Sequence, residues 1–301
     1  MPNGTLFEWL EILNAEVYVD VDKIRRLAQY RGIPREVRGE VWKYLLGVEL
    51  ADRSHEVAVD QAHQEEYAHI DKHHSEYARR VHRDTDRYLA RQSATLQAAG
   101  SGGGGGLSVR LTRDDDAPVL ENVLNAYLNR HTAVEYHAAL VPLCAPLVAT
   151  LDRESDVFFC FERITAALDE YTLEHPVNTR VARFITLFRL TLPELFNYFQ
   201  EEEVDMNEWI SSWLLGLLTR ELPLDNIISL WDHYFSHDTF IHFHTYVGLA
   251  ILKFCRPSLE ELEQSEIRTF LLHLPRLDIA QVIVVANNIQ TEIQKQDRLD
   301  I

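Results

Sequence analysis

Three residues in the first third of the chain have the types and the spacing to act on a phosphate. Val81, Asp84 and Arg87 follow one another at intervals of three residues. An aspartate three residues before an arginine can hold the guanidinium in a fixed orientation, so that the cation is oriented before a partner binds. Such a cation stabilises the charge that spreads over a phosphoryl group during transfer, and a partner enzyme can borrow it. Arg87, supported by Asp84, is therefore the first candidate for chemistry.

The surroundings of Arg87 also allow a simpler interpretation. The neighbouring arginines are Arg79, Arg80, Arg83 and Arg91. In a helical protein, such a run is usually a solvated face whose arginines pair with acidic residues three or four positions away. The segment alone leaves both interpretations open.

The composition indicates a folded protein that avoids polyanions. The 301 residues are 46% hydrophobic and 10% aromatic, which is typical of globular domains. The formal net charge is −18, from 47 acidic and 29 basic side chains. Such a surface repels phosphate backbones and anionic lipid, so we expect neither nucleic-acid binding nor direct membrane insertion. The charge suits a basic patch on a partner, or it only keeps the protein in solution.

The cysteines and the N-terminal residues indicate the compartment. Cys144, Cys160 and Cys255 are widely spaced and form no Cys-x-x-Cys pair, which argues for a reducing compartment and against a disulfide framework. The first residues show neither a basic segment nor an apolar segment of a secretory signal. No apolar run approaches the roughly 20 residues of a spanning helix. We predict a cytoplasmic protein, recruited to endomembranes through its partners.

Apolar residues recur every three or four positions along nearly the whole chain, which is typical of helices. Residues 35–46 are a clear case, with Pro34 at the start and Gly47 just past the end. Ser258 and Glu261 form a capping-box pattern that predicts another helix start. Further helices are predicted over 56–92, 120–129, 132–151, 156–174, 179–201, 209–220, 224–235, 239–254, 265–272 and 278–294. The sequence predicts an all-α fold of two half-lobes, divided near residue 175.

A polar stretch at 93–118 interrupts the helical pattern. Residues 101–106 are a serine and five glycines, which cannot hold a helix because glycine loses the most backbone entropy. We predict a flexible, disordered loop inside one domain. The acidic run 114–116 is interpreted as a solvated loop rather than a metal site, because nothing nearby completes an oxygen ligand set. The expected organisation is an N-terminal helical extension over 1–30 and one domain over 31–295.

Several blocks of the chain, taken in order, resemble the TBC domain, the module of Rab GTPase-activating proteins. Arg38-x-x-x-Trp42 resembles the first motif of the family, and Val81-x-x-Asp84-x-x-Arg87 resembles the second, with valine for the usual isoleucine. The third block reads Tyr136-His137-Ala138-Ala139, followed by Leu143-Cys144-Ala145-Pro146. The late block Leu222-Pro223-Leu224 to Trp231-Asp232 resembles the Pro-Leu and Trp-Asp signature of the family. The resemblance spans roughly residues 30–290.

The resemblance implies specific roles for these residues. It implies that Arg87 is an arginine finger, inserted beside the GTP phosphates of a bound Rab, and that Asp84 orients the local groups. It implies that Trp42 anchors the core and that Arg38 holds a neighbouring loop by hydrogen bonds. The candidate partner-binding residues are Arg38, Trp42, Tyr136 and His137. No cofactor is expected, since GTP and Mg²⁺ belong to the partner GTPase, which is a small GTPase of the Rab type.

The third block departs from the family at the position that aligns the attacking water. The family pattern is Tyr-x-Gln-Gly, so Ala138 stands where the glutamine finger is expected, and its methyl group cannot hydrogen-bond to water. Three outcomes remain open. The GTPase could use its own glutamine, Glu135 or His137 could substitute, or the domain could bind without accelerating hydrolysis. On a helix, neighbours one apart would point in different directions, which counts against substitution.

We therefore predict a regulator rather than an enzyme: a TBC domain for vesicle trafficking with weak or no GTPase-activating activity. The alternative is a catalytically inactive TBC scaffold that acts as a subunit or adaptor in a larger complex. Other sites have weaker support. His242-x-His244 with Asp238 lacks a further metal ligand at suitable spacing. No P-loop and no Gly-x-Ser-x-Gly elbow occur in the sequence. The aromatic residues between 184 and 213 are expected in the core.

Overall fold

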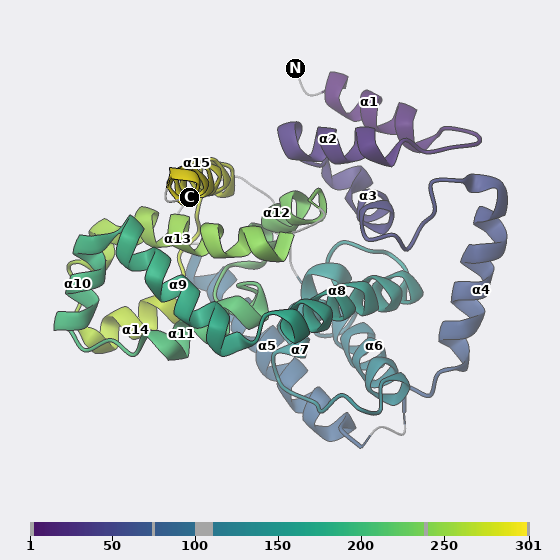
Figure 1. Ribbon diagram of the computed structural model, residues 1–301. Coiled ribbons are helices and arrows are strands. Elements are labelled where there is room, and N and C mark those ends of the chain that lie inside the picture. Colours follow the sequence, from purple (N-terminus) through teal and green to yellow (C-terminus); the bar gives the residue numbers. More distant parts are fainter. Residues whose placement is uncertain (1–2, 74–75, 100–110, 238–239, 300–301) are drawn as a thin grey trace. The chain divides into compact units, whose positions relative to one another are not determined.

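A computed structural model describes residues 3–73, 76–99, 111–237 and 240–299 (Figure 1). The chain forms two compact units, one up to Ala166 and one from Ala167 onward. The boundary therefore falls inside a helix, α8 (Glu154–Glu174), rather than near residue 175. Within the described ranges there are helices and no strands, which confirms the all-α prediction. None of these helices is long and apolar enough to cross a membrane.

The described residues of the first unit form seven α-helices, two short 3-10 helices and the start of α8. In chain order they are α1 (Asn3–Leu13), α2 (Val21–Arg31), η1 (Arg35–Val37), α3 (Arg38–Leu45), η2 (Arg53–His55), α4 (Glu56–His69), α5 (Ala78–Ala99), α6 (Asp116–Arg130) and α7 (Leu140–Val148). Helix α5 packs against both α6 and α7, which pack against each other (Figure 1). An isolated antiparallel bridge joins Tyr18 to Asp52.

Helix α3 shows how local sequence and packing combine in this unit. Gly47 has φ +69° just past its end, which is the left-handed conformation that glycine adopts at low cost. Gly39 allows a close approach, because a Cβ there would lie 2.9 Å from the carbonyl oxygen of Thr150. Trp42 is fully buried, so the expected core anchor is confirmed. The close approach at Gly39 brings α3 against the segment that follows α7.

A buried ion cluster ties α3 to α8 in the same unit. The ammonium of Lys43 lies 2.8 Å from Glu40, 3.2 Å from Glu49 and 3.6 Å from Asp156, and the side chain of Lys43 is 8% exposed. Burial by itself lowers the pKa of Lys43, but the hydrogen bond and charge of Glu40, with the charges of Asp156 and Glu49, raise it above its ordinary value. The lysine therefore stays charged inside the unit.

In the second unit, the part of the chain that the structure describes forms the end of α8 and seven more helices. They are α9 (Val177–Thr191), α10 (Pro193–Glu201), α11 (Met206–Gly216), α12 (Leu224–Phe235), α13 (Phe240–Leu259), α14 (Gln264–Leu272) and α15 (Ile279–Leu299). Helix α13 packs along α15, and α9 packs against both α10 and α11 (Figure 1). The predicted aromatic core is confirmed: Phe184, Phe188, Trp209 and Trp213 are at most 1% exposed and meet edge to face.

Several predicted helix boundaries are wrong, and proline explains two of them. The helix expected over 179–201 is two helices, because Pro193 opens α10. The helix expected over 132–151 begins only at Leu140. Pro142 accounts for this start, because in a longer helix its ring would clash with the carbonyl of Ala138, four residues earlier. The capping box expected at Ser258 is also wrong, since α13 continues through that residue.

The corrected capping box lies one turn later in the chain. Glu263 caps α14, and Glu266 completes the reciprocal pair of hydrogen bonds. The polar stretch 93–118 is shorter than expected, since α5 runs to Ala99 and α6 starts at Asp116. The glycine run 101–106, predicted to be a disordered loop, lies outside the described residues.

Candidate functional site

Helix α5 carries Arg87 on its exposed side. The opposite side of the helix is buried, with Val81 and Thr85 fully buried and Tyr88 and Leu89 at most 5% exposed. This packing fixes the helix, while the side chain of Arg87 is 66% exposed. The arginine is therefore presented to solvent from a rigid element.

Asp84 holds Arg87 from the helix side. Its Oδ1 lies 3.4 Å from Nη1 of Arg87 and 3.6 Å from Nε of Arg83. Its Oδ2 accepts a hydrogen bond of 3.0 Å from the hydroxyl of Tyr136. The Asp84 side chain is only 12% exposed, so these contacts restrict it strongly. One carboxylate thus connects the arginine to the segment that carries the third sequence block.

Tyr136 is the buried end of this connection. It is 4% exposed, and its ring stacks with Tyr77 at a centroid distance of 5.9 Å. The guanidinium of Arg80 lies 5.1 Å from the same ring and donates to the Tyr136 carbonyl oxygen at 3.4 Å. Burial, followed by the hydrogen bond to Asp84, raises the pKa of Tyr136 above its ordinary value. The phenol therefore keeps its proton and acts as the donor.

Ala138 lies on an exposed loop. Residues 131–139 are not helical, and Glu135, His137 and Ala138 are exposed. Buried residues anchor the loop on both sides of Ala138, namely Tyr136 and Leu140. The helical argument against substitution by Glu135 or His137 is therefore wrong, because their directions are not set by a helix. A longer side chain at position 138 would enter solvent.

The two candidates on α3 have supporting positions. Arg38 donates from Nη2 to the carbonyl oxygen of Ile33 at 2.8 Å, as expected for a residue that holds a neighbouring loop. Trp42 is fully buried and Tyr136 nearly so. The expectation that Trp42 and Tyr136 bind a partner directly is therefore wrong, because neither side chain offers surface to another protein. Of the four candidates for partner binding, His137 is the exposed one.

The structure thus joins Arg87, Asp84 and Tyr136 through hydrogen bonds, with Ala138 two residues further along the loop. The sequence interpretation missed Arg80, whose ring contact and hydrogen bond fix Tyr136. Its spacing of four residues before Asp84 was the available signal, since such residues share one helix face. Pro142 was the corresponding signal that Ala138 lies outside a helix.

Two aspartates of the acidic run 114–116 act in local structure. Asp116 accepts from the backbone N–H of Thr112 at 2.5 Å, and Asp115 accepts from the Thr112 hydroxyl at 3.2 Å, so this run organises the start of α6. Within the described ranges, no group of three or more His, Cys, Asp or Glu side chains has the arrangement of a metal site.

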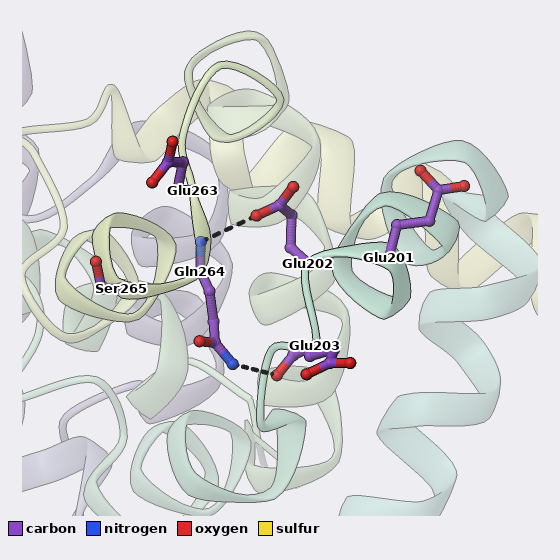
Figure 2. Close-up of a pocket in the computed structure, with 6 residues that line it drawn as sticks. All are labelled: Glu201, Glu202, Glu203, Glu263, Gln264 and Ser265. Carbon is purple, nitrogen blue, oxygen red and sulfur yellow. Dashed lines mark hydrogen bonds between the residues drawn. The ribbon is translucent and has the colours of Figure 1, made fainter.

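A pocket of about 420 Å³ lies in the second unit, where α10 ends and α14 begins (Figure 2). It is lined by Glu201, Glu202, Glu203, Glu263, Gln264 and Ser265. Gln264 connects the two segments, donating from its backbone N–H to Glu202 at 3.2 Å and from its amide to the carbonyl oxygen of Glu203 at 2.7 Å. Four of the six lining residues are glutamates, whose carboxylates repel phosphate, so this pocket does not suit a nucleotide.

Known proteins resemble this chain in sequence and in fold. A sequence model of the Rab-GTPase-TBC domain family matches residues 35–260. TBC1 domain family member 22A of Homo sapiens is 27% identical over 285 residues, covering 85% of this chain and 53% of its own length. The GTPase-activating protein gyp1 of Schizosaccharomyces pombe is 28% identical over 297 residues, covering 89% and 56%. The chain therefore spans about half the length of these curated relatives.

Solved structures show the same fold. The crystal structure of the Ypt/Rab-GAP domain of Gyp1p matches with a TM-score of 0.75 at 18% identity, covering 96% of this chain and 97% of that one. The Chlamydomonas flagellar RabGAP TBC domain matches with a TM-score of 0.64 at 17% identity, covering 93% and 88%.

Proposed function

Because the chain belongs to the Rab-GTPase-TBC domain family, we propose that it binds a small GTPase of the Rab type and offers Arg87 to the phosphates of the bound GTP. The proposal includes weak or no acceleration of hydrolysis, because Ala138 occupies the position of the water-aligning glutamine. GTP and Mg²⁺ are carried by the partner. The role in trafficking, on endomembranes to which partners recruit the chain, belongs to the same proposal.

One observation carries this proposal. Arg87 is two-thirds exposed, yet its guanidinium is held by Asp84, which is itself held by the buried Tyr136. A solvated charged face needs no such second support. An arginine that must enter a nucleotide site benefits from it, because less side-chain freedom is lost when the complex forms.

Arg87 and position 138 make different contributions to the rate of GTP hydrolysis. An arginine finger contributes about 10³ to 10⁵ in rate in well-studied GTPases, by stabilising charge on the transferred phosphoryl group. Loss of the water-aligning group at position 138 lowers the rate by a factor of about 10² or more, by analogy with removal of one oxyanion donor. With Arg87 present and a methyl group at position 138, hydrolysis depends on whether the GTPase aligns the water with its own glutamine.

The proposal includes water alignment by a neighbouring residue, either Glu135 or His137. Glu135 and His137 flank the critical position on the same exposed loop, and either could align water in place of the missing amide. The alternative function is a catalytically inactive scaffold that serves as a subunit or adaptor in a larger complex. The absent glutamine favours the scaffold, and the supported, exposed Arg87 favours the regulator.

Single-turnover GTP hydrolysis by a panel of purified Rab GTPases tests the proposal. The proteins to compare are the wild type, Arg87→Ala, Ala138→Gln and the control Arg31→Ala. Arg31 is a suitable control because its side chain is 54% exposed and pairs with Glu8 at 2.6 Å, on a helix other than α5.

We expect weak or no stimulation by the wild type and a gain of about 10² or more in Ala138→Gln. Any stimulation should disappear in Arg87→Ala and persist in the control. If no variant binds or stimulates any Rab protein, the regulator is excluded and the scaffold is favoured. If the wild type stimulates as strongly as Ala138→Gln, the assigned consequence of the alanine is wrong.

A further inference from the structure

Four arginines on α5 form a row that includes Arg87. They are Arg79, Arg83, Arg87 and Arg91, spaced by four residues and all exposed. We call them the arginine row. An α-helix turns about 100° and rises about 1.5 Å per residue, so the row drifts by about 40° and advances about 6 Å at each step. The row is therefore about 18 Å long.

The row faces away from the protein interior. Val81, Thr85 and Leu89 mark the centre of the buried side of α5. The same helical geometry places the middle of the row roughly opposite to these three residues. The row is thus the outermost line of the helix, and Arg87 lies inside it rather than at its edge.

The charge of this helix contrasts with that of the whole chain. Helix α5 carries five arginines against two aspartates, a formal net charge of +3, in a protein of net charge −18. Asp84 is shared between Arg83 and Arg87. Asp86 is engaged by Arg113 at 2.6 Å and by His82 at 3.7 Å. The acidic groups on the helix therefore leave an excess of positive charge along its exposed side.

We propose that the arginine row docks an acidic stretch on the surface of the GTPase, next to its nucleotide. The proposal rests on the proposed function, because it requires Arg87 to reach the phosphates. With Arg87 at the phosphates, Arg83 and Arg91 lie about 6 Å to either side along the axis and Arg79 about 12 Å away. The outer arginines then meet protein surface around the nucleotide, and carboxylates are the groups that a guanidinium binds there.

A protein partner fits better than a lipid surface or a nucleic acid. A membrane or a duplex extends far beyond an 18 Å row and would face the rest of an acidic molecule. A folded partner can place a short acidic segment against the row and basic or neutral groups elsewhere. Complementary charge of this kind raises the association rate and selects among related partners. The row therefore determines which GTPases bind.

The test removes the two ends of the row and leaves the support of Arg87 intact. The variant is Arg79→Gln/Arg91→Gln, which keeps Asp84 and the two arginines that pair with it, Arg83 and Arg87. The matched control is Lys23→Gln/Arg26→Gln on α2, which removes the same charge from another helix of the first unit. Both variants are compared with the wild type for association with Rab GTPases that carry a non-hydrolysable GTP analogue. The salt concentration is varied from about 50 to 300 mM, because salt screens exposed charges increasingly over this range.

We expect the row variant to associate about tenfold more slowly at low salt and to depend less on salt, with the control unchanged. Equal rates for the row variant and the control would overturn the inference while leaving the proposed function in place. Loss of binding to phosphatidylserine vesicles, instead of to the GTPase, would overturn it in favour of a lipid surface. If the wild type binds no Rab protein, the proposed function fails and this inference fails with it. Circular dichroism confirms that both variants are folded.

Discussion

The hydroxyl of Tyr136 donates a hydrogen bond of 3.0 Å to Oδ2 of Asp84, whose other oxygen faces Nη1 of Arg87 at 3.4 Å. A buried tyrosine on one segment thus sets the position of an exposed arginine on another. Ala138 follows Tyr136 by two residues. Positions 87 and 138, on which the proposed function depends, are therefore both connected to the hydrogen-bonded set Arg87–Asp84–Tyr136, which we call the joint. The joint lies wholly within the first unit.

Replacing Tyr136 with phenylalanine removes one hydrogen bond from this joint. Asp84 then loses its partner on the buried side, so the free energy of unfolding should fall by about 1–2 kcal/mol. Urea denaturation measures the change. Tyr30→Phe is the control, because Tyr30 is 83% exposed and its hydroxyl can bond to water in either state. Identical unfolding curves for the wild type and Tyr136→Phe would show that the hydrogen bond does not restrain Asp84.

Replacing Lys43 with methionine should destabilise the first unit strongly. The substitution keeps the volume but leaves Glu49 and Asp156, each 10% exposed, without the central ammonium. Breaking a buried ion pair from one side costs about 3 kcal/mol or more. Thermal and urea unfolding give the measurement, and Lys23→Met on the surface should change stability by less than about 0.5 kcal/mol. A cost for Lys43→Met as small as that of the control would contradict the role assigned to the cluster.

Acidification should destabilise the second unit through His244. Its Nε2 lies 2.8 Å from the carbonyl oxygen of Trp213 and its Nδ1 lies 2.5 Å from the hydroxyl of Tyr234, which suits a neutral ring with the proton on Nε2. Burial lowers the pKa of His244 to about 4, from an ordinary value of 6.5. Between these two values the unfolded chain binds a proton that the folded chain does not.

The contribution of His244 is therefore complete above pH 6.5 and is lost as the pH falls toward 4. The full effect of this one group is on the order of 3 kcal/mol. His233, whose pKa burial also lowers to about 4, adds to it in the same direction. Unfolding by urea at pH 7, 6 and 5 should show a shallower pH dependence in His244→Gln than in the wild type. Parallel pH profiles would mean that His244 has the same pKa in the folded and the unfolded chain, which would contradict the prediction.

Replacing Gly39 with alanine should test the close approach of α3 to the chain after α7. The new Cβ would lie 2.9 Å from the backbone oxygen of Thr150, which cannot move as a flexible side chain would. We expect a loss of about 1–3 kcal/mol, in spite of the better helix propensity of alanine. Gly216→Ala is the matched control, since its nearest neighbour is Thr219 at 3.9 Å. That variant should be neutral or slightly more stable, and a similar loss in both would contradict the packing argument.

Much of the fold could be predicted because helices depend on local pattern. The periodic apolar residues predict the helices, and Gly47 predicts the end of α3 because its role is set within one turn of chain. The errors fall where a single residue overrides the pattern. Pro193 divides a long apolar run into α9 and α10, and Pro142 delays the start of α7. Both prolines are visible in the sequence, but the spacing of apolar residues alone does not take into account the effect of proline on helix boundaries.

The sequence pattern alone identifies the family, the all-α class and the candidate residues Asp84, Arg87 and Ala138. The folded chain adds that Tyr136 is a buried support and that Ala138 lies on an exposed loop. The reason is physical: Asp84 and Tyr136 are separated by 52 positions, and no local pattern encodes which distant group satisfies a nearly buried carboxylate. That pairing arises when α5, α6 and α7 pack together, and it restrains Asp84 beside Arg87.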